Sequence, residues 1–180
     1  MYNKTWRNER TVEIPIVWEY VKPYLDKEIL EIGNVMAHYY SFMHDVVDKY
    51  EKAPGVINRD AVDFQTEKTY DLIISISTFE HIGWDEEPRD PSRILLAFDA
   101  IKKLLAPQGK MIVTLPIGYN SYLDSLLNEN ALPFSEMFYL QRISRGNTWK
   151  EVTWDDIRNA QFNKPYQAAN GLIIGIFEKT

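Results

Sequence analysis

Apolar residues along the chain gather in short continuous runs, and these runs predict the strands of a sheet. The run from Thr69 to Ser77 is the strongest, and its nearly unbroken apolar character indicates a central parallel strand buried on both faces. Six further runs predict the remaining strands: 29–32, 46–48, 56–57, 110–115, 138–143 and 171–178.

Helical spacing separates several of these runs. A polar arm is expected over 1–12, followed by a helix over 13–26 with Pro15 in its first turn. A second helix begins at Asp90-Pro91, a cap followed by proline at the first helical position, and ends at 107–109. Three other helical segments are predicted: 35–42, 120–128 and one that begins at 153–156. The apolar face of the first helix is predicted to carry Ile14, Val17, Trp18, Val21 and Leu25.

Strands and helices that alternate in this way predict a doubly wound α/β fold. Its opening segment carries the first sign of chemistry, because the run that ends at Glu31-Ile32-Gly33 is followed by a second run that ends at Asp48. A glycine after the first strand lets the backbone turn beside a ligand, and an acid after the second strand accepts hydrogen bonds from ribose hydroxyls. The pattern is therefore typical of a nucleotide-binding βαβ unit.

Composition narrows the possible classes of function. The chain has 180 residues, which fits a single domain, and its formal net charge of −6 disfavours nucleic acid as a partner. The absence of cysteine excludes disulfides and thiolate catalysis. The first residues lack the apolar core of a signal peptide, and the apolar runs fall far short of the roughly 20 residues that span a bilayer. We therefore expect a cytoplasmic protein without a membrane span.

The order of several short motifs between 28 and 115 resembles the class I S-adenosylmethionine-dependent methyltransferases. The motifs are Leu30-Glu31-Ile32-Gly33, Asp48, Asp60-Ala61, Tyr70 to Ser75 with Glu80-His81-Ile82, and Leu105 to Lys110. The resemblance implies a Rossmann-like, seven-stranded mixed sheet with helices on both faces and the last strand inserted antiparallel. It divides the single domain 1–180 into an N-terminal arm and helix (1–27), a cofactor-binding half (28–115) and a substrate-side half (116–180).

By position, the resemblance also implies which residues would hold S-adenosyl-L-methionine. Glu31 and Gly33 would line the methionine end, and Asp48 would hold the ribose hydroxyls. Asp60 would meet the adenine amino group with Ala61 beside it, and Ser77 and Thr78 would lie under the sulfonium. The chain departs from the usual Gly-x-Gly-x-Gly at 33–37, where it reads Gly-Asn-Val-Met-Ala, and a β-branched valine narrows the approach of the backbone.

Methyl transfer needs alignment and electrostatics, and it needs a general base only where the acceptor must lose a proton. His81 is the candidate catalytic base, because a neutral imidazole accepts a proton near pH 7, and Glu80 is the second candidate, as its orienting partner. No metal site is expected. Tyr119, Tyr122 and Phe134 follow the predicted fifth strand and are candidates for the wall of the acceptor site.

The sequence favours methyl transfer to a small-molecule or glycan acceptor, with a sugar hydroxyl as the first hypothesis. The altered glycine motif keeps an alternative open: a non-catalytic, methyltransferase-like binding or scaffold protein that has lost the cofactor. A nicotinamide-dependent reductase is compatible with Gly33 and Asp48, but no Tyr-x-x-x-Lys pair occurs in the chain. The sequence sets neither the nucleophilic atom of the acceptor nor the oligomeric state.

Overall fold

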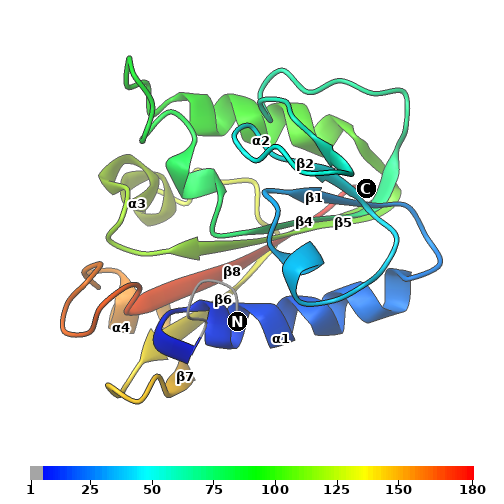
Figure 1. The fold of residues 1–180 in the computed structure, drawn as a ribbon. Helices are drawn as coiled ribbons and strands as arrows, with labels where there is room; N and C mark the ends of the chain where they lie inside the picture. The colour runs from blue at the N-terminus through cyan, green and yellow to red at the C-terminus, as the bar shows by residue number, and fades with distance from the viewer. Residues whose placement is uncertain (1–5) are drawn as a thin grey trace.

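The computed structural model describes residues 6–180, which form one mixed sheet between two layers of helices (Figure 1). The strands lie in the order β3-β2-β1-β4-β5-β8-β6-β7. Their bounds are β1 Ile29–Ile32, β2 Asp45–Val47, β3 Val56–Ile57, β4 Tyr70–Ile76, β5 Leu105–Pro116, β6 Glu136–Arg142, β7 Trp149–Val152 and β8 Gly171–Glu178.

Strand direction decides which chain segments meet at the same edge of the sheet. Strands β3, β2, β1, β4 and β5 are parallel, β8 is antiparallel to β5, and β6 is antiparallel to β8. Strand β6 therefore runs in the same direction as β4 and β5, and its carboxyl end lies at the edge where the five parallel strands also end. Ligands of doubly wound folds bind at this edge.

Two hydrophobic clusters hold the layers to the sheet. Alternate residues of β4 point to opposite faces, so that Leu72, Ile74 and Ile76 join the cluster under helix α1 and Ile73 joins the cluster under α2 and α3. Helix α1 lies below the sheet in Figure 1, and α2 and α3 lie above it. The helix bounds are α1 Arg10–Val21, α2 Arg93–Lys103, α3 Ser121–Asn128 and α4 Trp154–Ile157, with 3-10 turns η2 Lys22–Tyr24, η3 Met36–His38 and η4 Phe79–His81.

The predicted fold class is confirmed, including the antiparallel insertion of the final strand. The predicted strand number is wrong, because the described residues form eight strands. The additional strand, β7, is an edge strand of half-buried and exposed residues, so it carries no continuous apolar run.

Three predicted helices differ from the structure. Helix α2 begins at Arg93 with Ser92 as its N-cap, so the predicted start, with Asp90 as the cap and Pro91 as the first helical residue, is two residues too early. Helix α1 begins at Arg10, within the predicted arm, and ends at Val21, so Leu25 is 44% exposed and does not join its apolar face. The first five residues of the predicted arm lie outside the described part of the chain. The helix predicted over 35–42 is only the turn η3, because the aromatic residues after it pack on α1: the rings of Tyr40 and Trp18 stack 3.9 Å apart. None of the helices within residues 6–180 has the length and apolarity needed to traverse a bilayer.

Candidate functional site

A cavity of about 390 Å³ opens at the carboxyl ends of β1, β2, β3 and β4. Side chains and backbone from each of these strand ends line it, because parallel strands end at one edge. Of the residues predicted from the sequence to bind or act, six line this cavity: Gly33, Asp48, Asp60, Ala61, Thr78 and His81.

The glycine turn after β1 forms one wall of the cavity. Gly33 has a φ of +84°, and a Cβ atom at this position would stand 2.2 Å from Oγ1 of Thr78, so only glycine fits between the turn and the end of β4. Val35 follows at the rim of the same cavity, whereas Met36 is fully buried in the cluster under α1. Of the two residues that replace glycines, Val35 lines the cavity, whereas Ala37 is exposed and does not line it, so the cavity stays open.

We expect Gly33→Ala to lower the free energy of unfolding by about 2 kcal/mol or more, because it combines a left-handed backbone with a steric clash. Gly55→Ala is the matched control, since Gly55 has a φ of +85° but nothing within 4 Å of the added Cβ. Urea unfolding of both variants separates backbone strain from the clash. Equal losses in the two variants would show that the contact with Thr78 carries no energy.

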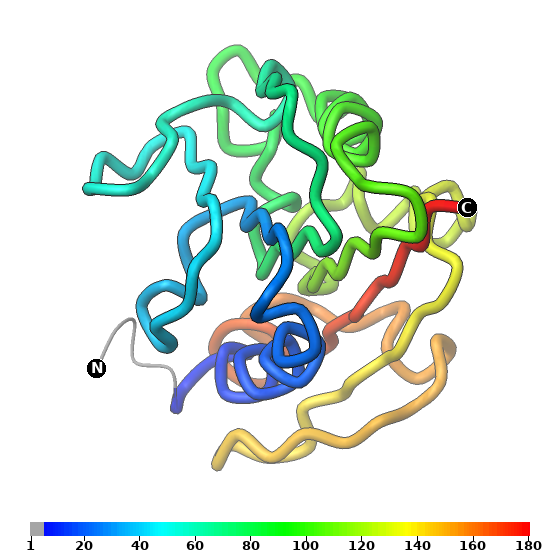
Figure 2. The backbone as a smooth tube through the Cα atoms, turned by 90° about the vertical axis from the view of Figure 1, so that its right-hand side faces the viewer, coloured from blue at the N-terminus to red at the C-terminus, as the bar shows by residue number. Residues whose placement is uncertain are grey.

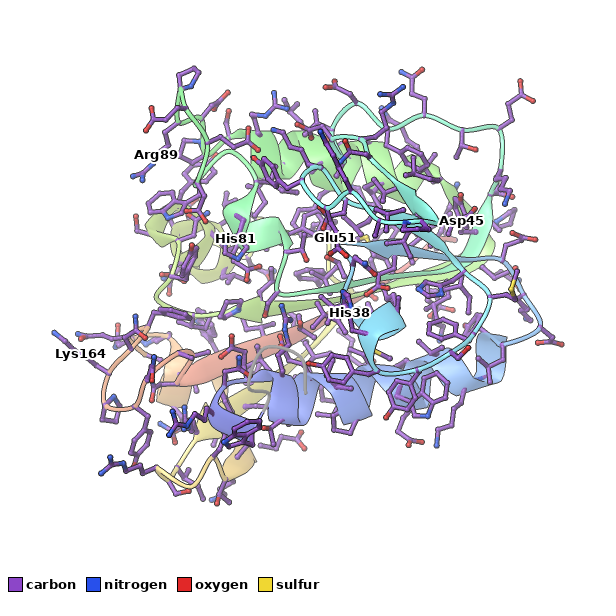
Figure 3. All side chains as sticks on the ribbon, viewed as in Figure 1. His38, Asp45, Glu51, His81, Arg89 and Lys164 are labelled. Carbon is purple, nitrogen blue, oxygen red and sulfur yellow. The ribbon has the colours of Figure 1, made fainter. Side chains whose placement is uncertain are left out.

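Asp48, at the end of β2, organises the loop that follows it. Its Oδ1 accepts hydrogen bonds from the backbone N–H groups of Tyr50 and Glu51 at 2.8 and 2.7 Å, and its Oδ2 accepts one from Asn34 N–H at 3.3 Å. Glu51 is turned into the cavity, and its Oε1 accepts a bond from Asn34 Nδ2 at 2.7 Å. Figure 3 shows Glu51 beside His38, whose Nε2 lies 3.6 Å from Glu51 Oε1. The glycine loop and the loop after β2 are thus tied together by acids at the cavity.

Asp60 lies in a network of ion pairs on the opposite wall. Its Oδ2 lies 2.9 Å from both Lys49 Nζ and Arg93 Nη2, and Lys49 also reaches Glu86 at 2.8 Å. Burial alone would raise the pKa of Asp60, but the hydrogen bonds from Lys49 and from Val62 N–H, with the two positive charges, outweigh it and lower the pKa. Asp60 is therefore an ionised carboxylate whose charge is already neutralised within the protein.

Glu31 and Ser77 are directed away from the cavity. Glu31 is fully buried; its Oε1 accepts hydrogen bonds from the N–H groups of Val35 and Met36, and its Oε2 lies 2.9 Å from His44 Nε2. Ser77 donates its hydroxyl to Glu13 Oε1 at 2.5 Å. Glu31 thus stabilises the glycine loop on the side that faces away from the cavity. Direct contact of Glu31 or Ser77 with a cofactor stays a prediction.

A buried polar cluster lies beneath the cavity, and Arg10 connects the two. Arg10 lines the cavity, and its Nη1 donates to Glu13 Oε2 at 3.0 Å and to the carbonyl of Ile76 at 2.9 Å. Glu80 is also buried here, and its Oε2 has no hydrogen-bond partner among the described residues. Burial, reinforced by the charge of Glu13, raises the pKa of Glu80 well above its ordinary value. Burial therefore favours the neutral, protonated form of Glu80.

His81 lies at the mouth of the cavity in a chain of polar contacts. Its Nδ1 lies 2.5 Å from Asp85 Oδ2, which also accepts a hydrogen bond from Tyr119 Oη at 2.6 Å. Burial would raise the pKa of Asp85, but these two hydrogen bonds outweigh it and lower the pKa. An ionised Asp85 favours the proton on Nδ1 of His81 and leaves Nε2 as the basic nitrogen.

The candidates for the acceptor wall separate in the structure. Tyr119 packs edge-on against His81, with ring centroids 4.8 Å apart, and against Phe162 at 5.0 Å. Phe134 instead packs in the core against Phe98, and Tyr122 packs against the same cluster. Only Tyr119 of the three therefore has a ring contact with a residue of the cavity among the contacts described.

Several residues that line the cavity were not predicted from the sequence. Lys49 and Glu51 belong to a charged loop that looks like ordinary surface, and Arg10 falls in the segment expected to be an arm. The spacing of Arg10 and Glu13 would have allowed a prediction that both lie on one face of a helix, where they can form an ion pair.

Comparison with known proteins gives a likeness at the level of structure. No family model matches the chain, and no curated protein sequence matches it. A SAM-dependent methyltransferase from Archaeoglobus fulgidus is 15% identical, with a TM-score of 0.56, over 97% of this chain and 96% of that chain.

Two other solved structures agree with this result. The N-methyltransferase NodS from Bradyrhizobium japonicum, in complex with S-adenosyl-L-homocysteine, is 15% identical with a TM-score of 0.54, over 95% of this chain and 91% of that chain. A SAM-dependent methyltransferase from Thermotoga maritima, described as a possible histamine N-methyltransferase, is 15% identical with a TM-score of 0.53, over 96% and 98% of the two chains. The chain has the fold of the class I S-adenosylmethionine-dependent methyltransferases.

Proposed function

We propose that this protein is an S-adenosylmethionine-dependent methyltransferase that acts on a small molecule or glycan, with a sugar hydroxyl as the first candidate acceptor. The observation that carries the proposal is the cavity of about 390 Å³, on which residues from four parallel strand ends converge. Its volume lies in the range of small-molecule sites, and it lies at the edge where doubly wound folds bind nucleotides. The methyltransferase fold supports the same assignment.

The residues present fit the chemical groups of this cofactor. Asp48 and Glu51 offer carboxylate oxygens to a ribose diol, and the acids of the cavity favour a positively charged sulfonium. Arg10 offers a positive charge to the carboxylate of the methionine part. Gly33 lets the backbone approach a ligand closely. The cofactor supplies an activated methyl group, and the protein supplies orientation and proton transfer.

His81 would accept the proton of the acceptor. A sugar hydroxyl is a weak nucleophile while it keeps its proton, so a base within hydrogen-bond reach accelerates its attack. Asp85 holds Nδ1 of His81, and Nε2, which lies 3.6 Å from Oε1 of Glu80, is the nitrogen left for this role. The side chain of His81 is 45% exposed at the mouth of the cavity, where an acceptor can reach it.

The second candidate function is a binding protein that has lost the cofactor. This function is favoured because two acids of the cavity already bind groups of the protein. Asp48 accepts three backbone hydrogen bonds, and Asp60 forms ion pairs with Lys49 and Arg93. Titration calorimetry with S-adenosyl-L-homocysteine distinguishes the two functions. Saturable heat supports the methyltransferase, and no heat at millimolar ligand supports the binding protein.

We expect Asp48→Ala to weaken binding of S-adenosyl-L-homocysteine about tenfold or more, on the scale of one lost charged hydrogen bond and a loosened loop. Asp63→Ala is the matched control, because Asp63 is an exposed acid near the cavity that does not line it. Calorimetry gives both affinities, and thermal melting verifies that both variants are folded. Unchanged affinity in folded Asp48→Ala would show that this acid does not hold the ribose.

A further inference from the structure

A second hollow of about 840 Å³ lies beside the start of α1, and its lining is basic and aromatic. Three arginines line it, together with the rings of Trp6 and Tyr166, and no carboxylate is among its described lining residues. This is unusual for a chain with a net charge of −6. We call this hollow the basic cleft; its arginines are Arg7, Arg142 and Arg145.

Buried side chains build the walls of the basic cleft. Arg142 is 6% exposed, and its guanidinium donates to the carbonyl oxygens of four residues that flank or line the cleft: Arg7, Ser144, Arg145 and Gln167. Asn147 is buried as well, and its Nδ2 donates to the carbonyl oxygens of Trp6 and Asn8. Three segments distant in sequence are thereby fixed together, so the cleft is preorganised.

Arg7 and Arg145 are the two arginines of the basic cleft that could bind a ligand. Both are exposed, and neither forms an ion pair with a carboxylate of the described residues. Glu9, whose charge acts on Arg142, is buried, and its Oε2 accepts a hydrogen bond from Ala169 N–H. Two guanidinium groups therefore border the cleft with their donors available, a geometry that suits an oxyanion.

Two chain segments connect the basic cleft with the cofactor cavity. Residues 6–10 contribute Arg7 to the cleft and Arg10 to the cavity. The loop 161–168 lines the cleft with Tyr166, while its Phe162 contacts Tyr119, which contacts His81. The start of α1, the turn between β6 and β7 and this loop lie together in both views (Figures 1 and 2). A row of aromatic rings therefore leads from His81 to the loop that walls the cleft.

We propose that the basic cleft binds the phosphate-bearing end of the methyl acceptor, as in a sugar phosphate or a nucleotide-linked sugar. The methyl transfer to this acceptor rests on the proposed function, whereas the phosphate site itself is inferred from the geometry of the basic cleft alone. Two guanidiniums without an ion pair match the charge of a phosphate, and Trp6, which is 55% exposed, offers a ring face on which a nucleobase stacks. The ring of Tyr166 lines the same cleft, with the guanidinium of Arg142 5.2 Å from its centroid. The aromatic row then places the other end of the acceptor at His81.

Titration calorimetry with glucose 1-phosphate and with uridine diphosphate tests the cleft without the reaction. We expect saturable binding with a Kd of about 1 mM or tighter, on the scale of a few charge-assisted hydrogen bonds. Tighter binding of uridine diphosphate identifies a nucleotide-linked acceptor, and equal binding identifies a sugar phosphate. Arg7→Ala and Arg145→Ala should each weaken binding about five- to tenfold, discounted for their exposure.

Lys164→Ala is the matched control. Lys164 projects from the outer end of the same loop, carries the same charge and does not line the cleft (Figure 3). Titration with S-adenosyl-L-homocysteine on the same preparations separates the two proposals. Absent binding of both phosphates, or equal weakening by Lys164→Ala and the arginine variants, overturns the cleft proposal whether or not S-adenosyl-L-homocysteine binds. Loss of S-adenosyl-L-homocysteine binding alone overturns only the proposed function.

Discussion

Replacing His81 by alanine is expected to lower kcat about a hundredfold or more and to leave the affinity for S-adenosyl-L-homocysteine nearly unchanged. The basic Nε2 is lost, while Gly33, Asp48 and Asp60 stay in place around the cavity. The measurement is the rate of S-adenosyl-L-homocysteine release with saturating acceptor, combined with calorimetry for the affinity. Equal turnover of the variant and the wild-type protein would remove His81 as the base.

Asp85→Asn tests the positioning of His81. An asparagine keeps the size of the side chain but removes the charge that favours the proton on Nδ1. We expect a smaller loss of kcat than for His81→Ala, because the imidazole keeps its place but loses the partner that favours the proton on Nδ1. An unchanged kcat would show that Asp85 serves only as a structural residue.

The second large effect is expected on stability, from Glu13→Gln in the buried cluster. Glu13 is fully buried; its Oε1 accepts hydrogen bonds from Ser77 and Thr114, and its Oε2 pairs with Arg10. A glutamine turns an amide donor toward the guanidinium of Arg10 and leaves that charge unpaired. We expect the free energy of unfolding in urea to fall by about 3 kcal/mol.

Glu80→Gln is the matched control, because Glu80 lies in the same cluster but its burial favours the neutral form. Burial raises its pKa, so the folded protein binds its proton more tightly than the unfolded chain, and its contribution to stability declines as the pH rises above the ordinary range of a glutamate. Glutamine does not titrate, so Glu80→Gln should become more stable relative to the wild-type protein from pH 4 to pH 8. A loss as large as that of Glu13→Gln would contradict this charge assignment.

The sequence predicts best those strands and helices whose bounds are determined by their own residues rather than by contacts with distant segments. Strands β1 and β8 begin and end where their apolar runs do, because both are buried along nearly their whole length. Helix α3 begins after Asn120, whose side chain accepts hydrogen bonds from Tyr122 and Leu123 N–H. Where tertiary contacts decide, prediction fails. The segment after Lys103 pairs with Tyr70 and becomes strand from Leu105, although its proline and glycine suggest only the end of a helix.

The cavity was predictable to the extent that topology alone determines it. Gly33, Asp48, Asp60 and Thr78 follow consecutive parallel strands, so the sheet order places them together. The sequence does not determine which groups a polar side chain near the cavity will contact. From the sequence, the side chain of Glu31 could face a ligand or the backbone amides of the glycine turn. In the folded loop it accepts hydrogen bonds from the amides of Val35 and Met36.

The order of strands has a consequence for how the molecule is made. Strands β6 and β7 are synthesised before β8, yet β8 separates them from β5 and is their link to the rest of the sheet. The nascent chain can therefore dock them only when residues 171–178 have left the ribosome. The cofactor half, which is local in sequence, can assemble early, whereas the wall that carries Arg142 and Arg145 waits for the last strand.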